Sequence, residues 1–363
     1  MEIIKPTLVI NKERILANIE RMSKKAKDSK VLFRPHFKTH QSSVIGEWFR
    51  NYGTKAITVS SIDMAIYFAK FGWDDITIAF PVNIRQINDI NKLAKKIKLN
   101  LLIESFETLN FLKDNLKSPV NIWLKIDTCN NRTGINWDDE PFISKMIREI
   151  KKTTNMKFIG LLTHAGHTYK AKSKQEIEGI YEDTYLKLKN IQERLFLQGF
   201  SSVKLSIGDT PGCSIVKDFR GVDEIRPGNF VFYDVMQLKL GSCQEEDIAI
   251  GLFCPIVAKH IERNELIIHG GAIHLSKDFV LQEDNSKCFG LVALPTENGW
   301  GKILEQTFVS SISQEHGVIK TTNKQLAKLN VGDLVVILPV HSCLTANVMR
   351  YYLSLDGEKI SIM

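Results

Sequence analysis

The apolar residues of the chain follow two different patterns, one before and one after about residue 236. In the first part, short apolar runs alternate with longer stretches whose apolar residues recur every three or four positions, the spacing of amphipathic helices. A leading helix is predicted at residues 12–30, where Ile15, Ile19 and Met22 share one face. Further helices are predicted at residues 43–52, 62–71, 84–97, 142–152 and 174–197, and strands at residues 31–33, 56–60, 76–80, 101–104, 120–127, 157–164, 203–208 and 224–232.

Strands that alternate with helices in this way predict a parallel sheet. Eight strands are also the number that closes a β/α barrel, and the span to Asp234 is close to the ~250 residues that such a barrel usually takes. A Rossmann sheet is the rival architecture, but no G-x-G-x-x-G sequence opens the first helix. We therefore predict an α/β protein with a TIM-like (β/α)8 barrel over residues 8–235.

The second part has strand-like runs that follow one another, separated by Gly, Asn and Asp turns, with little helical periodicity. This pattern is typical of an antiparallel sheet. We predict a C-terminal β-domain made of residues 236–363 together with residues 1–7. Its strands are predicted at residues 248–259, 265–268, 289–293, 307–312, 334–338, 350–355 and 359–363.

Composition and charge narrow the class of protein. The chain is 44% hydrophobic and 25% charged, as expected of a globular protein. The net charge of +7 comes from lysines scattered along helical stretches, which argues against a nucleic-acid surface. No apolar run reaches the ~18 residues of a membrane span, and the start lacks a signal-peptide pattern. The six cysteines form no C-x-x-C pair, so we expect a reducing, cytoplasmic setting.

Candidate chemistry is concentrated where the predicted barrel strands end. The first strand is followed by Arg34-Pro-His-Phe-Lys-Thr-His40, in which Pro35 should end the strand. A lysine at such a position, here Lys38, can become a neutral amine and form a Schiff base if it is desolvated or close to another cation. The ordinary alternative is a solvated lysine in a basic loop.

Two glycine-containing segments follow the seventh strand and interrupt the eighth, at residues 208–212 and 226–229. Barrels commonly bind phosphate in this region, and backbone N–H groups of such turns form anion-binding nests to which Thr210 adds a hydroxyl. Plain turns are the alternative. Near the C-terminus, His341 and Cys343 point to one side of an extended segment and would make half of a tetrahedral zinc site, unless both are simply packed.

The lysine segment and the sequence Pro-Val-His-Ser-Cys near the C-terminus resemble the family of D-serine dehydratases and D-threonine aldolases, pyridoxal phosphate enzymes with an alanine racemase-like barrel. The resemblance implies that Lys38 holds the cofactor covalently. It also implies a phosphate site at Thr210, Gly212, Gly228 and Asn229, from which Asp209 should point away. An arginine should meet the pyridine nitrogen, either Arg132, which we favour, or Arg226. His36, His167 and Tyr169 should line the pocket, Tyr169 also being able to reach the phosphate.

The same resemblance links the metal-ligand residues to one of two reactions, dehydration or retro-aldol cleavage. Members of the dehydratase type have His-x-Cys and bind zinc, whereas those of the aldolase type tend to have His-x-Asp and to use manganese, in line with ligand softness. Cys343 therefore favours Zn²⁺ over Mn²⁺ and dehydration of D-serine or D-threonine to a 2-oxo acid and ammonia. Retro-aldol cleavage to glycine and an aldehyde is the alternative, and a racemase or a non-enzymatic pyridoxal phosphate-binding protein is a third. The family also implies a homodimer acting on small D-amino acids.

Overall fold

The computed structural model describes residues 2–363, which form two compact units. We call residues 20–38 and 46–228 the barrel unit, and residues 2–19, 39–45 and 229–362 the sheet unit. The short segment 39–45 thus belongs with the C-terminal half of the chain although it directly follows Lys38. The domain boundary that the sequence suggests after residue 235 remains a prediction.

The barrel unit contains eight parallel strands in the order β2-β10-β9-β8-β6-β5-β4-β3. The two end strands are joined beyond β2, where His36 bridges to Thr58 and the N–H of Phe37 donates to the carbonyl of Thr58 at 2.8 Å. This closure confirms the predicted barrel. The strands are β2 (Leu32–Phe33), β3 (Ile57–Val59), β4 (Asp75–Pro81), β5 (Lys98–Ile103), β6 (Val120–Asp127), β8 (Met156–Leu162), β9 (Lys204–Ile207) and β10 (Glu224–Ile225).

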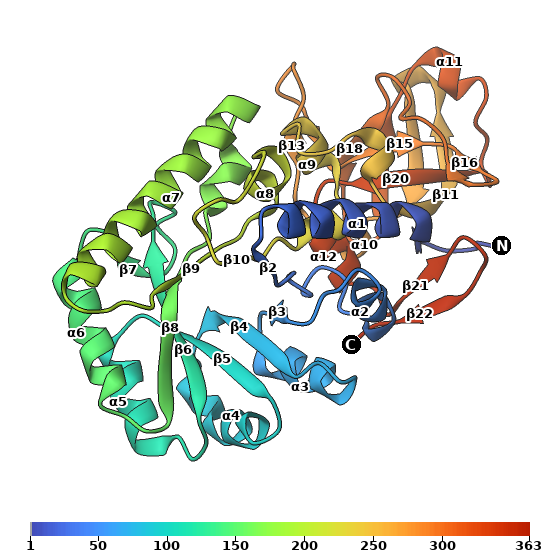
Figure 1. Cartoon of the computed structure of the whole chain (residues 1–363). Coiled ribbons are helices and arrows are strands. Elements are labelled where there is room, and N and C mark those ends of the chain that lie inside the picture. Colours follow the sequence, from blue (N-terminus) through green and yellow to red (C-terminus); the bar gives the residue numbers. More distant parts are fainter. Residues whose placement is uncertain (1) are drawn as a thin grey trace. The chain divides into compact units, whose positions relative to one another are not determined.

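Helices alternate with these strands, and Figure 1 shows α4 to α7 outside the strands β4 to β8. Several begin at a side chain that accepts a hydrogen bond from the first turn, as Ser61, Ser105 and Ser173 do. The helices are α1 (Lys12–Asp28), α2 (Ser43–Arg50), α3 (Ile62–Lys70), α4 (Ile87–Ala94), α5 (Phe106–Asn115), α6 (Glu140–Lys151), α7 (Lys174–Leu197) and α8 (Thr210–Ile215).

The eighth strand is shorter than the predicted span 224–232. β10 ends at Ile225, and residues 229–231 form a 3-10 turn instead. Pro227 explains the early end because it has no N–H to donate to a neighbouring strand. Its carbonyl accepts the N–H of His36 at 2.9 Å, so this segment still supports the loop that precedes Lys38.

An ion-pair network with a buried centre links the lysine segment to two barrel strands. The guanidinium of Arg34 donates to Glu224 at 2.9 Å and to Asp75 at 2.6 Å, and only 3% of the side-chain surface of Arg34 and of Glu224 is exposed. Removing one partner of such a pair leaves an uncompensated buried charge. Arg34 of the lysine motif therefore has a structural role, linking β2 to β4 and β10.

The sheet unit is built on nine strands in the order β12-β19-β18-β15-β20-β11-β1-β21-β22. Neighbours are antiparallel except β1 and β21, which confirms the predicted C-terminal sheet. Strand β1 (Thr7–Ile10), which the sequence did not predict, lies between β11 and β21. The others are β11 (Ile250–His260), β12 (Glu265–His269), β15 (Gly290–Ala293), β18 (Phe308–Ile312), β19 (His316–Lys320), β20 (Leu334–Pro339), β21 (Tyr351–Ser354) and β22 (Lys359–Ser361).

Residues 39–45 are fastened to this sheet by hydrogen bonds. The hydroxyl of Tyr352 donates to the carbonyl of His40 at 2.6 Å, and the hydroxyl of Ser42 donates to the carbonyl of Ser361 at 2.7 Å. Burial lowers the pKa of His40 to about 3, so its ring is neutral and structural. Within residues 2–363, no helix combines the length and the apolar character needed to cross a bilayer.

Candidate active site

Lys38 is oriented by the residue before it. Phe37 is fully buried and packs against Phe49, Phe68 and Trp73, with ring centroids 5.0 to 5.2 Å apart. Lys38 is exposed, while its backbone N–H donates to Nδ1 of His36 at 3.3 Å. The aromatic anchor therefore holds the loop in place and leaves the lysine side chain at the C-terminal end of β2, where β/α barrels hold their active sites.

His164, which follows β8, lies close enough to Lys38 for their charges to interact. Desolvation, and after it the charge of Lys38, lower the pKa of His164 well below its usual value. Its Nδ1 atom lies 2.5 Å from the carbonyl oxygen of Gly208. A neutral imidazole is therefore held beside the lysine. The sequence showed that His164 follows a strand but gave no sign of this proximity.

Lys125 is a second amine at this end of the barrel, and sequence reasoning did not identify it. Its side chain is buried, with Nζ donating to the carbonyl of Ile126 at 2.9 Å. Burial, and then the charge of Arg226, lower the pKa of Lys125 to about 7. A lysine that is easily deprotonated is a candidate base, and it is also a rival to Lys38 for any carbonyl compound.

The two candidate arginines occupy different environments. Arg226 is buried, and its guanidinium donates to the hydroxyl of Ser206 at 2.6 Å and to the carbonyl of Thr163. Burial lowers its pKa to about 10, so it remains a cation at neutral pH. Arg132 is exposed on the loop after β6.

Asp127 does not pair with Arg132. Its carboxylate accepts the backbone N–H groups of Asn130, at 2.9 Å, and of Asn131, at 3.1 and 3.2 Å. The carboxylate thus shapes the loop that carries the arginine. Within residues 2–363, the Arg132 guanidinium has no hydrogen-bond or ion-pair partner.

The predicted phosphate segment after β9 forms the start of helix α8. The hydroxyl oxygen of Thr210 is buried and, among the described residues, has no hydrogen-bond partner. Such an orphaned polar atom fits an oxygen of a bound phosphate. Asp209 departs from expectation: it caps α8, and its Oδ1 accepts the N–H of Gly212 at 2.6 Å and the hydroxyl of Thr168 at 3.0 Å. The Gly212 N–H is therefore already used.

The second predicted phosphate segment is also partly engaged elsewhere. Gly228, which follows Arg226 and Pro227 in the sequence, is buried. The side-chain amide of Asn229 donates to Asp234 at 2.6 Å and to Ser342 at 2.9 Å. Its side chain thus supports the segment of His341 and Cys343 instead of offering its N–H groups to a phosphate.

The remaining predicted pocket residues lie around β8. Tyr169 belongs to a 3-10 turn after β8, with its ring centroid 6.5 Å from that of His164. Burial and the charge of Lys187 lower the pKa of His167, whose Nδ1 lacks a hydrogen-bond partner among the described residues. These two rings and His164 provide neutral polar groups at one end of the barrel.

His341 and Cys343 lie together at the junction of β20 and the short helix α12 (Ser342–Asn347). Nδ1 of His341 is 2.7 Å from Oδ2 of Asp278. Although burial acts to lower it, hydrogen bonding to Cys343 and to Asp278 raises the pKa of His341 to about 9. An imidazole beside a thiol, with a carboxylate on the other ring nitrogen, fits a zinc ligand pair with an outer carboxylate.

The pair is supported from two directions within the sheet unit. Asp234, at the start of a short helix α9 (Val235–Lys239), accepts the backbone N–H of Ser342 at 3.0 Å. The hydroxyl oxygen of Thr39 lies 3.1 Å from Sγ of Cys343. Thr39 is the residue directly after Lys38, so the peptide that carries the lysine continues into the wall of the thiol site.

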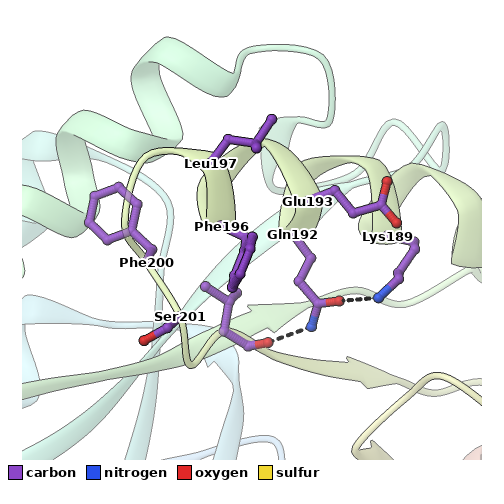
Figure 2. A pocket seen from close by; sticks show the side chains of 8 residues that line it. Lys189, Gln192, Glu193, Phe196, Leu197, Phe200 and Ser201 are labelled. Atoms are coloured by element: carbon purple, nitrogen blue, oxygen red, sulfur yellow. Dashed lines mark hydrogen bonds between the residues drawn. The ribbon is translucent and has the colours of Figure 1, made fainter.

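A cavity of about 610 Å³ lies between the end of α7 and the loop before β9. Figure 2 shows two hydrogen bonds among its lining residues: Lys189 donates to Gln192 at 2.8 Å, and Gln192 donates to the carbonyl of Val203 at 2.6 Å. It adjoins the N-terminal end of β9, opposite the end where barrel enzymes work. We therefore do not assign the active site to it.

Comparisons with known proteins agree with this layout. Residues 10–235 match the family described as "Alanine racemase, N-terminal domain", and residues 249–355 match that described as "Putative serine dehydratase domain". The D-serine dehydratase of Dictyostelium discoideum is 29% identical over 97% of this chain and 93% of that enzyme. The D-threo-3-hydroxyaspartate dehydratase of a Delftia species is 25% identical over 97% of this chain and 94% of its own length.

The solved structure of the Delftia enzyme superposes with a TM-score of 0.91 at 24% identity, covering 99% of this chain and 98% of that one. It therefore shares the fold of this chain over its whole length. A variant of that enzyme with a cysteine replaced by alanine is described as being in a metal-free form.

Proposed function

Because this chain belongs to the alanine racemase-like family of pyridoxal phosphate enzymes that have a C-terminal serine dehydratase domain, we propose that it is a pyridoxal phosphate- and zinc-dependent lyase that dehydrates a D-3-hydroxy amino acid. D-Serine and D-threonine are the first substrates to test, with a 2-oxo acid and ammonia as products. The observation that carries the proposal is the chain continuity between Lys38 and Thr39, whose hydroxyl contacts Cys343.

The residues at the barrel end fit pyridoxal phosphate. Thr210 has a buried hydroxyl without a partner among the described residues, and the charges of Lys38, Lys125 and Arg132 each lower the pKa of His164 at the barrel end. A dianionic phosphate is favoured by this positive setting. We assign covalent attachment to Lys38, a phosphate contact to Thr210 and the pyridine nitrogen to Arg132. When bound, the cofactor supplies an electron sink for the negative charge at the substrate Cα.

Lys38 would also be the base that takes the Cα proton of a bound substrate, a role that an amine can fill only while neutral. His164 stays neutral beside it and so adds no charge of its own. Tyr169 and His167 provide polar contacts for the substrate.

The donor set at His341 and Cys343 fits zinc. Thiolate and imidazole are ligands that Zn²⁺ prefers, and Asp278 holds the histidine through Nδ1, which leaves Nε2 for the metal. A Lewis acid held there would assist the departure of the β-hydroxyl group. The soft thiolate supports zinc over manganese, and therefore supports dehydration over retro-aldol cleavage.

Product analysis tests this proposal. Purified holoenzyme is incubated with D-serine, D-threonine and D-threo-3-hydroxyaspartate, with L-serine as the stereochemical control. We expect a 2-oxo acid and ammonia in equal amounts from at least one D-substrate, and loss of the reaction on zinc chelation. Lys38→Ala should lower the rate at least about 1000-fold, whereas Lys92→Ala, at an exposed lysine, should not. Glycine and an aldehyde as the only products would refute dehydration.

Two further properties complete the proposal. The family resemblance supports a homodimer, which light scattering after size-exclusion chromatography tests directly. All six cysteines are free thiols, which supports a reducing compartment such as the cytoplasm.

A further inference from the structure

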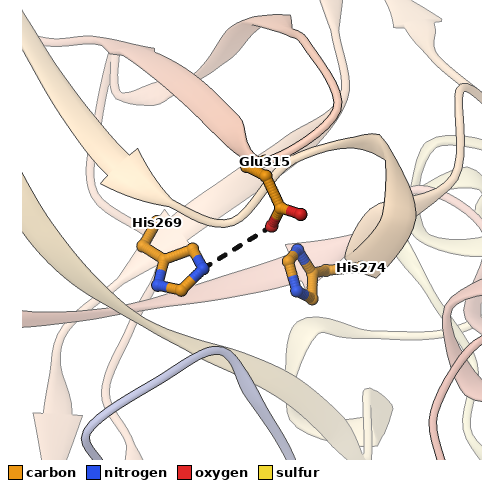
Figure 3. A group of neighbouring side chains, drawn as sticks. All are labelled: His269, His274 and Glu315. Atoms are coloured by element: carbon orange, nitrogen blue, oxygen red, sulfur yellow. Dashed lines mark ion pairs between the residues drawn. The ribbon is translucent and has the colours of Figure 1, made fainter.

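We propose that His269, His274 and Glu315 form a second metal site, separate from His341 and Cys343, which takes a divalent cation of borderline softness such as Zn²⁺. The three side chains come from different elements of the sheet unit: the end of β12, the helical turn α10 (Ala272–Leu275) and the loop between β18 and β19. Figure 3 shows them converging. The site takes no part in the lyase chemistry proposed above.

The spacing of the ligand atoms is close to that of a bound ion. One nitrogen or oxygen atom from each residue lies within 4.8 Å of the other two. Nε2 of His269 is 3.6 Å from Oε2 of Glu315. Zinc bonds of about 2.0–2.1 Å in a tetrahedral site put neighbouring ligand atoms roughly 3.4 Å apart. That pair is therefore already near the required separation, and His274, within 4.8 Å of both, must approach it more closely.

The backbone beneath the cluster is fixed by close contacts. The N–H of Gly270 donates to the carbonyl of Glu315, and the N–H of Ala272 donates to the carbonyl of Ser313, both at 2.8 Å. A Cβ atom on Gly271 would lie 2.5 Å from the carbonyl oxygens of Ser313 and Gln314. Only glycine permits this approach. The two histidines and the glutamate are thus brought together by a rigid crossing of two segments.

The donor types and the ring orientations also suit a metal. Nδ1 of His274 accepts the backbone N–H of Gly271 at 3.3 Å, which orients the imidazole and leaves Nε2 for a metal. The rings of His269 and His274 are nearly perpendicular, with centroids 5.7 Å apart. Two imidazoles and a carboxylate favour Zn²⁺, Co²⁺, Ni²⁺ or Cu²⁺ over the hard ions Mg²⁺ and Ca²⁺. The partial exposure of His269 and Glu315 leaves room for water as the remaining ligand.

A cation at this position would tie β12, α10 and the β18–β19 loop together. Because a preformed site is absent from the unfolded chain, binding stabilises the folded sheet unit by an amount that grows with the logarithm of the free metal concentration above Kd. The proposed role is therefore structural, with a metal affinity that is independent of the substrate.

The test is zinc stoichiometry and affinity, measured by equilibrium dialysis and plasma mass spectrometry on the pyridoxal phosphate-loaded protein. The variants are His274→Gln, Glu315→Gln and His341→Gln. His260→Gln is the matched control, since His260 also lies 3.6 Å from a glutamate, Glu262, but was not found in a three-ligand group among the described residues. Circular dichroism and thermal unfolding without added metal verify that each variant is folded.

We expect wild type and His260→Gln to bind two Zn²⁺ per chain, and His341→Gln to retain one. His274→Gln and Glu315→Gln should weaken zinc binding at the second site at least about 100-fold. Loss of an outer-shell partner costs up to that factor, and loss of a direct ligand should cost no less. A single zinc that is lost only in His341→Gln would overturn this inference. A single zinc that persists in His341→Gln and is lost in His274→Gln would uphold it and instead refute the metal pair of the proposed active site.

Discussion

The hydroxyl oxygen of Thr39 lies 3.1 Å from Sγ of Cys343, although the two residues are 304 positions apart in the sequence. Thr39 is the immediate neighbour of Lys38. The contact makes one residue both a neighbour of the proposed cofactor lysine and a partner of the proposed metal thiolate.

Removing that hydroxyl should weaken metal binding. In Thr39→Val the thiolate loses a hydrogen-bond donor while the shape of the side chain is kept, so we expect zinc affinity to fall by about 10- to 100-fold. Thr39→Ser keeps the hydroxyl and should stay within a few-fold of wild type. Competition with a chromogenic zinc chelator measures both. Equal affinities in the valine and serine variants would show that the contact does not support the metal.

Replacing the thiolate by a carboxylate should change which metal is bound. In Cys343→Asp the ligand pair becomes imidazole and carboxylate, which is harder, so the preference for Zn²⁺ over Mn²⁺ should decrease. Metal content after reconstitution with equimolar zinc and manganese measures this preference. Cys288→Ser, at a buried cysteine of the sheet unit, is the control and should leave the metal content unchanged. An unchanged zinc preference in Cys343→Asp would argue that Cys343 is no ligand.

The assignment of Arg132 to the pyridine nitrogen has a spectroscopic test. Arg132→Met removes the cation that keeps the pyridine nitrogen unprotonated. The visible absorption of the bound cofactor should therefore change with pH as that nitrogen gains and loses a proton. Arg226→Lys keeps a buried cation and should leave the spectrum close to that of wild type. A shifted spectrum in the Arg226 variant, with none in Arg132→Met, would reverse the assignment.

Asp209 should make stability depend on pH. Burial raises the pKa of Asp209 from 3.8 to about 6. The folded state therefore binds this proton more tightly than the unfolded state, and the free energy of unfolding falls as pH rises from about 4 to 6. Asp209→Asn removes this effect, so its advantage over wild type should be absent near pH 4 and reach ~2–3 kcal/mol at pH 8.

Urea unfolding at several pH values measures that difference. Asp218→Asn is the control, because hydrogen bonds from Arg220 lower the pKa of this partly exposed carboxylate and its replacement should give no gain at high pH. A constant offset between Asp209→Asn and wild type from pH 4 to pH 8 would contradict the account.

Much of the fold follows from local pattern. Strand β6 and helix α7 begin and end at the predicted residues, because long apolar runs and regular helical spacing define them well. Strand β1 was missed because its apolar run, Leu8 to Ile10, is short and lies directly before a helix. Helix α8 was taken for a turn because Pro211 and Gly212 are typical of turns, whereas here Asp209 caps a helix.

The site was less predictable because it depends on burial and on contacts across the chain. Lys38, His341 and Cys343 stood out through local motifs, but nothing local distinguishes Lys125 from a solvated lysine. The interaction of His164 with Lys38 likewise arises only when the barrel closes. His269 and Glu315 are brought together by strand pairing between β12 and β19, which the sequence did not predict.

The most direct test of the account is where the cofactor is attached. Holoenzyme is reduced with borohydride, digested, and its peptides are mapped by mass spectrometry. We predict a single pyridoxyl group, on Lys38. Attachment to Lys125, the buried lysine whose pKa is lowered to about 7, or no modified lysine at all, would contradict it.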